Sequence, residues 1–225
     1  MFDRIAPTYD LLNRTLSFGI DRRWRDAALD ALLTDLPTGP VLDLCAGTLD
    51  LTAALVRRAP ERPLYALDLS REMLERGRSK LPARAAALTV GDATELPFAA
   101  GAFAGVIVGF GIRNVAVTLD ALREVHRVLS PGGRFVTLEL FRPTRWVTRV
   151  FHATYARGVL PSVGRLASRD QLAYRYLADS MAGFLPRSEY ETLLQTAGFE
   201  SVSGRDLLLG AASVVVGARG PKNKM

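Results

Sequence analysis

The feature that most constrains this chain of 225 residues is an apolar stretch that ends in a turn of small residues. Val41–Leu51 reads Val-Leu-Asp-Leu-Cys-Ala-Gly-Thr-Leu-Asp-Leu, and a second apolar stretch follows and ends at Asp68. In a doubly wound α/β sheet, ligands bind beyond the carboxyl ends of the strands, and an acid about 20 positions after the turn can bind ribose hydroxyls. The pattern therefore predicts a sheet that holds a nucleotide-like cofactor.

Strand and helix patterns alternate through the middle of the chain. Strands are expected at residues 41–44, 64–67, 86–90, 105–108 and 134–140, and helices at residues 51–58, 71–80 and 119–129. Ser70 is the expected N-cap of the second helix, and a Ser-Pro-Gly-Gly turn should end the third. This alternation favours a parallel sheet with helices on both faces.

The two ends of the chain depart from this alternation. We expect one domain over residues 1–225, in which N-terminal helices (1–37) precede a cofactor-binding core (38–143). A helical cap with a substrate role (144–185) and a C-terminal helix with a closing hairpin (186–225) should follow. The helix is expected at 188–196, and the hairpin strands at 201–209 and 212–218.

Composition excludes several classes of protein. With 48% hydrophobic residues the chain can bury a sizeable core, and no stretch reaches the roughly 20 apolar residues of a spanning helix. Its start lacks the layout of a signal peptide, so we expect a cytoplasmic protein. Cys45, His126 and His152 have no metal-site spacing, so no metal is expected.

The net charge of +6 suits an anionic partner, which could be nucleic acid, an anionic membrane or a ligand. Many of the arginines lie between residues 134 and 175, interleaved with Trp146, Phe151 and Tyr155. This segment is either a solvated helical face or an interfacial one. Nucleic acid is disfavoured, because no RNA-binding module is recognisable.

The turn after the first strand has the chemistry of an anion site. Ala46 and Gly47 let a ligand approach the backbone, and the helix after Thr48 directs its free N–H groups there. A turn of small residues can also serve packing alone. The turn has neither the Gly-x-Gly-x-x-Gly of a dehydrogenase nor the Gly-Lys-Ser/Thr of a P-loop. A ligand with a nucleoside at one end and a carboxylate at the other remains, and S-adenosylmethionine (SAM) is such a ligand.

Four segments carry a family resemblance. They are residues 1–13 (Met-Phe-Asp-Arg-Ile-Ala-Pro-Thr-Tyr-Asp-Leu-Leu-Asn), 16–24 (Leu-Ser-Phe-Gly-Ile-Asp-Arg-Arg-Trp), 110–115 (Phe-Gly-Ile-Arg-Asn-Val) and 174–180 (Tyr-Arg-Tyr-Leu-Ala-Asp-Ser). The chain resembles the ubiquinone/menaquinone biosynthesis C-methyltransferase family, which has the class I SAM-dependent methyltransferase fold. The resemblance implies a Rossmann-like, mostly parallel sheet of about seven strands with an antiparallel last strand, N-terminal helices and a helical cap.

The resemblance also implies which residues contact the cofactor. Thr48 matches a contact position in the loop, and Asp68 matches the position at the ribose. Asp92 and Ala93 match positions at the adenine, and Gly109 matches a contact position after the fourth strand. By the pattern of the class, Asp43 and Gly47 shape the methionine end, and Met73 lies against the adenine. Asp92 could instead be an ordinary turn residue, and Met73 an ordinary core residue of a helix.

The chain departs from the family in the cofactor loop, where Ala46-Gly47-Thr48-Leu49-Asp50 stands in place of the usual Gly-Gly-Thr-Gly-Asp. If position 49 has a positive φ, leucine costs about 1 kcal/mol or more, and its side chain could crowd the methionine moiety. Alternatively, Leu49 begins the helix and points away from the ligand. Gly109 also replaces the usual serine and so lacks a hydroxyl contact.

The resemblance implies methylation of a ring carbon of a prenylated quinol. Arg113 and Asn114 should face the quinol, with Tyr9 and Asp10 as lid partners. Because an arginine side chain stays charged at neutral pH, Arg113 suits the stabilisation of a phenolate rather than proton abstraction. His152 could act as a base, whereas the position of His126 favours a surface or capping role.

Three further points stay open at the level of sequence. The acceptor could be a benzoquinol, a naphthoquinol or another small molecule, and Leu49 could mark a non-catalytic homologue with impaired SAM binding. An amphiphilic acceptor would favour reversible contact with the inner leaflet of the membrane. The chain could be a monomer or a homo-oligomer.

Overall fold

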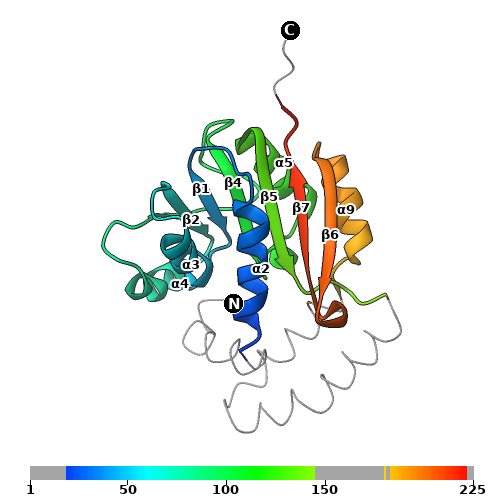
Figure 1. The fold of residues 1–225 in the computed structure, drawn as a ribbon, viewed down its shortest axis with the longest axis horizontal. Coiled ribbons are helices and arrows are strands. Elements are labelled where there is room, and N and C mark those ends of the chain that lie inside the picture. Colours follow the sequence, from blue (N-terminus) through cyan, green and yellow to red (C-terminus); the bar gives the residue numbers. More distant parts are fainter. Residues whose placement is uncertain (1–18, 145–179, 181–182, 222–225) are drawn as a thin grey trace.

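The computed structural model describes residues 19–144, 180 and 183–221. Its strands form one sheet in the order β3-β2-β1-β4-β5-β7-β6 (Figure 1). The strands are β1 (Val41–Leu44), β2 (Leu64–Asp68), β3 (Ala87–Val90), β4 (Phe103–Gly109), β5 (Leu129–Glu139), β6 (Glu200–Leu207) and β7 (Ala212–Ala218).

The strand directions confirm the predicted sheet. β1 pairs in parallel with β2 and β4, and the parallel pairing continues to β3 on one side and β5 on the other. β7 is antiparallel to both β5 and β6, so β6 runs in the same direction as β5. The turn between β6 and β7 therefore lies at the edge where the parallel strands end. We call this the carboxyl edge.

The helices connect the strands at the predicted places. The described helices are α2 (Asp21–Leu33), α3 (Asp50–Arg58), α4 (Arg71–Gly77), α5 (Thr118–Val128) and α9 (Arg187–Thr196). The 3-10 turns are η1 (Arg78–Lys80), η2 (Ile112–Asn114) and η4 (Leu208–Gly210). Ser70 caps α4 as expected, since its Oγ accepts a hydrogen bond from the Met73 N–H at 3.2 Å.

Two predicted elements fall outside the described residues, namely the first N-terminal helix within 1–18 and most of the helical cap at 145–179. Within the part of the chain that is described, no helix is both long and apolar enough to cross a bilayer.

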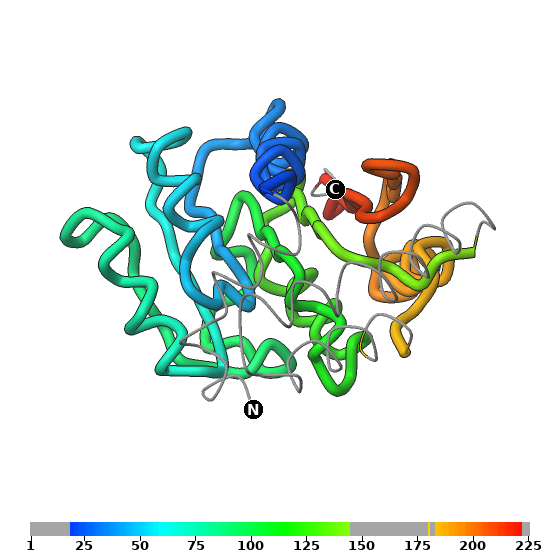
Figure 2. The backbone as a smooth tube through the Cα atoms, turned by 90° about the horizontal axis from the view of Figure 1, so that it is seen from below, coloured from blue at the N-terminus to red at the C-terminus, as the bar shows by residue number. Residues whose placement is uncertain are grey.

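Apolar side chains fill a layer on each face of the sheet. Leu29 and Leu32 of α2 pack with Leu55 of α3 against one face, whereas Leu122 of α5 and Leu194 of α9 pack against the other. Figure 2 shows α2 on the opposite side of the sheet from α5 and α9. The expectation of helices on both faces is confirmed.

The start of β5 differs from the expected boundary. The strand begins at Leu129 rather than at residue 134, so the Ser-Pro-Gly-Gly stretch lies within it. The pairing with β4 shifts register between the pairs Phe103–Leu129 and Gly105–Arg134. The extra residues bulge out between these two pairs, and Gly132 allows this with a φ of +76°.

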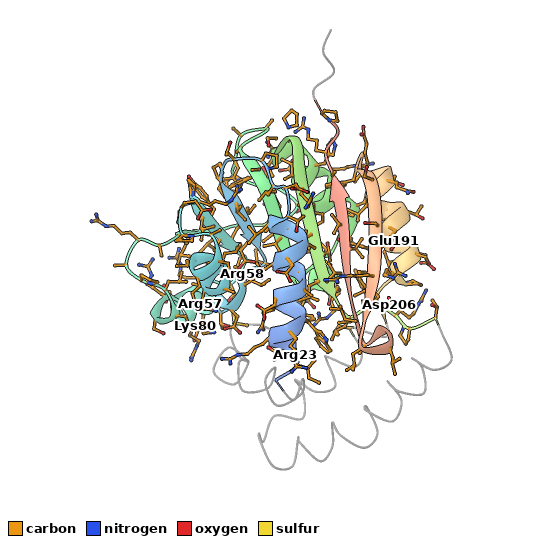
Figure 3. All side chains as sticks on the ribbon, viewed as in Figure 1. Arg23, Arg57, Arg58, Lys80, Glu191 and Asp206 are labelled. Atoms are coloured by element: carbon orange, nitrogen blue, oxygen red, sulfur yellow. The ribbon has the colours of Figure 1, made fainter. Side chains whose placement is uncertain are left out.

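The C-terminal helix and the predicted hairpin form one unit. Arg187 of α9 contacts Glu191 at 2.5 Å and Asp206 of β6 at 3.1 Å, and Figure 3 shows these two acids on neighbouring elements. In the core, the hydroxyls of Tyr190 and Thr137 are 2.8 Å apart, which ties α9 to β5.

Candidate functional site

The carboxyl ends of β1 and β4 mark the natural crevice of this sheet. The chain crosses from β1 to β2 on one side, and the later strands extend from β4 on the other. Such a switch point leaves a crevice between the diverging connections. The loop 45–49 and η2 follow strands that end at this edge, and Asp68 is the last residue of β2. Sequence positions that are far apart are thereby brought to one place.

The cofactor loop is anchored by Asp68. The Gly47 N–H donates to Asp68 Oδ2 at 2.8 Å, and the Ser70 N–H donates to Oδ1 at 2.8 Å. Gly47 has a φ of +52°, and among the described residues no atom lies within 4 Å of where its Cβ would stand. The described part of the chain therefore leaves this side of the loop open, and the Asp68 carboxylate beside it is partly exposed.

Asp43 lies fully buried within β1. Its Oδ2 accepts a hydrogen bond from Thr52 Oγ1 at 2.6 Å. Its Oδ1 has no hydrogen-bond partner among the described residues. Burial raises the pKa of Asp43 to about 7, although the bonds from Thr52 act in the opposite direction. An acid that changes its charge near neutral pH thus supports the first turn of α3.

Leu49 combines features of both interpretations of the loop. It is the N-cap of α3 and has a φ of +64°, so the strained backbone is confirmed. Its side chain is fully buried and packs with Ala66 and Leu74. Of the two alternatives for the side chain, this packing favours the one in which it points away from the ligand, because the isobutyl group lies in the interior between β2 and α4.

Charged side chains brace the loop from outside. Lys80 Nζ donates to Thr48 Oγ1 at 3.1 Å and to Asp50 Oδ1 at 2.7 Å. Arg25 of α2 contacts Asp50 as well, at 3.3 Å. Figure 3 shows Lys80 at the lower end of the sheet, where the parallel strands finish. The loop is thus held by helices on both of its sides.

The residues expected at the adenine occupy different environments. Asp92 is exposed, and its Oδ1 accepts from the Thr94 N–H and Oγ1, each at 2.8 Å. These bonds lower the pKa of Asp92. Ala93 and Met73 are buried, with 5% and 2% of their surface exposed. The Gly91 N–H donates to the Asp68 carbonyl at 3.0 Å, which holds this turn beside the end of β2.

The segment after β4 folds back over the neighbouring strand. At Gly109 a Cβ would stand 2.5 Å from Leu51 Cδ1, so the glycine gives room to α3. The Phe110 carbonyl accepts hydrogen bonds from Arg113 Nη1 at 2.8 Å and from Asn114 Nδ2 at 3.5 Å. The two residues expected to face the acceptor are thus placed by one backbone carbonyl.

Glu139 is a site residue that the sequence reasoning missed. It is the last residue of β5, it is fully buried, and its Oε1 lies 2.5 Å from Arg113 Nη1. In the sequence, Glu139 stands out as an acid near the end of a mostly apolar strand. Only the order of the strands in the sheet shows that it contacts Arg113.

Several other candidates lie elsewhere. Tyr9, Asp10 and His152 are outside the described residues. His126 lies in the last turn of α5, which leads into the start of β5 and so lies away from the carboxyl edge. Its ring packs edge-on against Phe199, and burial lowers its pKa. Burial also raises the pKa of Cys45, which makes its thiol a poor nucleophile.

A family model identifies this arrangement. The model described as the ubiE/COQ5 methyltransferase family matches residues 1–219. The chain belongs to the ubiE/COQ5 methyltransferase family. The match confirms the resemblance found in the sequence and the enzyme class expected from it, a SAM-dependent methyltransferase.

Similar proteins of known annotation agree with this membership. The ubiquinone/menaquinone biosynthesis C-methyltransferase of Syntrophotalea carbinolica is 42% identical over 97% of this chain and 92% of its own length. The demethylmenaquinone methyltransferase of Thermus thermophilus is also 42% identical, over 97% of this methyltransferase and its own full length (100%).

Solved structures support the fold. A SAM-dependent methyltransferase of Thermotoga maritima has a TM-score of 0.68 at 19% identity and covers 97% of both chains. A SAM-dependent methyltransferase of Aquifex aeolicus has a TM-score of 0.61 at 16% identity over 87% of this chain and 89% of its own. At such low identity the likeness confirms the class I methyltransferase fold alone.

Proposed function

We propose that this methyltransferase transfers a methyl group from SAM to a ring carbon of a prenylated quinol in respiratory quinone biosynthesis. The observation that carries the proposal is a contact at the carboxyl edge between two residues that belong to different signature segments. Arg113, from residues 110–115, donates from Nε to Oγ of Ser180, the last residue of 174–180, at 3.3 Å. The printed names of the relatives supply the substrate class.

The donor set fits SAM. Asp68 offers a carboxylate to ribose hydroxyls, and the described residues leave room for the ligand beside Gly47. We assign Thr48 and Asp43 to the methionine end, and the buried Met73 to the adenine side together with Asp92 and Ala93. Gly109 borders the same crevice from β4. When bound, SAM supplies an electrophilic methyl group.

On the acceptor side, we assign Arg113 and Asn114 to the oxygen of the quinol, with Tyr9 as a further polar partner. Ionisation of the hydroxyl raises electron density at the neighbouring ring carbon, and a fixed guanidinium stabilises the phenolate that forms. Arginine keeps its charge throughout, so its role is electrostatic. Because catalysis of this kind depends on positioning and on exclusion of water, it needs no covalent intermediate with the protein.

The acceptor carries a long apolar tail, so we also propose that the protein is cytoplasmic and binds reversibly to the inner leaflet. Five described large apolar side chains are highly exposed, and all five follow or end strands at the carboxyl edge: Leu69, Val90, Val117, Leu208 and Leu209. An apolar rim at the substrate side suits a lipid surface.

The direct test is incubation with methyl-labelled SAM and each demethylated quinol, the naphthoquinol and the benzoquinol, under reducing conditions. We expect label in the ring of at least one lipid, and loss of that label in Asp68→Ala. The exposed Glu95→Ala is the matched control and should keep activity. If SAM binds by calorimetry but neither lipid gains label, the acceptor is another small molecule.

A further inference from the structure

A buried ion pair joins η2 to the end of β5. The side chain of Arg113 is 7% exposed and that of Glu139 is fully buried, and Nη1 and Oε1 are 2.5 Å apart. A buried charge is tolerated when it is paired and its remaining polar atoms are hydrogen-bonded. The stability of the pair therefore depends on how the remaining polar atoms of both side chains are hydrogen-bonded.

The Glu139 carboxylate receives three N–H groups. Besides Arg113 Nη1, the Leu140 N–H donates to Oε1 at 2.8 Å, and the backbone N–H of Arg113 donates to Oε2 at 3.3 Å. One carboxylate thus holds both the backbone and the guanidinium of the same arginine. Because Glu139 ends a central strand, this anchor is as rigid as the sheet.

The guanidinium is held through two of its three nitrogens, Nη1 and Nε. Nη1 also donates to the Phe110 carbonyl, and Nε donates to Ser180 Oγ. None of the described residues accepts a hydrogen bond from Nη2. The two N–H bonds of Nη2 are therefore the part of Arg113 that these contacts leave for an acceptor oxygen.

The strained backbone places this group beside the cofactor loop. Phe110 has a φ of +59°, although its N–H still bonds the Leu138 carbonyl at 2.8 Å. At the next residue, Gly111, a Cβ would stand 2.4 Å from Cys45 Cβ. The chain thus passes directly against the loop after β1 before it reaches Arg113, so the pair and the loop share one crevice.

We propose that Glu139 is the positioning residue for Arg113 and directs Nη2 toward the ring oxygen of the acceptor. This inference rests on the proposed function, because it assigns the phenolate as the partner of Nη2. A guanidinium that is fixed before the phenolate forms needs no reorganisation during the reaction. Without Glu139, the arginine would remain charged but lose its main anchor.

The first test compares Glu139→Gln with its parent. The amide keeps the shape and can still accept the Leu140 N–H. We expect kcat to fall about 100-fold, in the range seen when one preorganised donor is lost, with an unchanged KM for SAM. Glu124→Gln, which alters the ion pair with Arg127 on α5, is the matched control and should leave kcat unchanged. Should Glu139→Gln not fold, Glu139→Asp is measured in its place.

A double-mutant cycle separates positioning from a general structural role. If Glu139 acts through Arg113, the variant Glu139→Gln/Arg113→Lys should be no slower than Arg113→Lys alone. Additive losses would overturn the proposal. If the parent methylates no quinol, the proposed function fails. If the parent is active but Glu139→Gln keeps the kcat of the parent, only the positioning role fails.

A readout that needs no turnover is the ionisation of bound 1-naphthol, followed by absorbance. Positioning predicts that Glu139→Gln raises the pKa of the bound naphthol, because the guanidinium is misplaced. If Glu139 only offset the positive charge of Arg113, its loss would lower the pKa of the bound naphthol. A lower pKa in the variant would therefore contradict the proposal.

Discussion

At the scale of single residues, the site contains buried acids with different roles. Glu139 is neutralised by Arg113, whereas Asp43 is hydrogen-bonded by the Thr52 hydroxyl and N–H and forms no ion pair with any described residue. Its second oxygen lacks a partner among the described residues. The physical consequence is a raised pKa for Asp43 and an ionised state that is costly in the fold.

This cost gives the first prediction. Burial raises the pKa of Asp43 from 3.8 to about 7, so the folded state binds its proton more tightly than the unfolded state. Stability therefore falls as pH rises between these values. Asp43→Asn has no such penalty. From about pH 5 to about pH 7.5, the free energy of unfolding of the variant should gain roughly 2 kcal/mol relative to the parent.

Urea denaturation at the two pH values measures the difference, and other titrating groups cancel because both proteins share them. Asp26→Asn, at an exposed position of α2, is the control and should show no such gain. Equal pH dependence in Asp43→Asn and its parent would show that Asp43 is ionised without cost in the fold.

At the scale of elements, the end of α4 acts as a support for the cofactor loop. A Cβ at Gly77 would stand 2.5 Å from the backbone carbon and oxygen of Thr48 and 2.6 Å from Leu49 Cγ. Three residues later, Lys80 bonds Thr48 and Asp50. The glycine at position 77 thus makes room for the leucine at position 49.

Gly77→Ala tests this support. Gly77 has helical backbone angles, with a φ of −69°, so alanine would ordinarily stabilise the helix by about 0.5–1 kcal/mol. We expect the opposite, a lower melting temperature and SAM affinity weakened on the order of tenfold, because the methyl group must displace the loop. Glu75→Ala on the same helix is the control. Thermal unfolding and calorimetric titration give the two readouts, and a stabilised variant with unchanged affinity would refute the idea.

At the scale of the whole molecule, the exposed large apolar side chains of the described residues are concentrated at one edge of the sheet. The turn between β6 and β7 presents Leu208 and Leu209, 47% and 69% exposed, both with positive φ. Exposed leucines with a strained backbone lower the stability of a fold, and an exposed apolar patch indicates a contact surface. The turn reaches the carboxyl edge only because β7 is antiparallel to its two neighbours.

The corresponding prediction concerns vesicles made of equal parts phosphatidylcholine and phosphatidylglycerol. Leu208→Ser/Leu209→Ser should reduce cosedimentation by about tenfold or more, since two apolar side chains no longer enter the lipid. Leu208→Met/Leu209→Met keeps the apolar character and should bind as the parent does. Activity toward a quinol without a tail should be equal in all three proteins. Equal sedimentation of the serine variant would exclude this turn as the contact.

Local sequence determined much of the fold. Apolar runs predicted β1, β2 and β3 almost to the residue, and Ser70 marked the start of α4, because periodicity and capping are properties of neighbouring residues. The signature segments also gave the family. These features need only residues that are close in the chain.

Tertiary structure decided how distant groups meet. The contact of Glu139 with Arg113, the burial of Leu49 against α4 and the register shift in β5 depend on which strands become neighbours. A leucine in a left-handed conformation reads as a defect in the sequence, yet the space left by Gly77 accommodates it. Packing is a property of surfaces from separate segments, so local patterns indicate which residues are buried but not which atoms they touch.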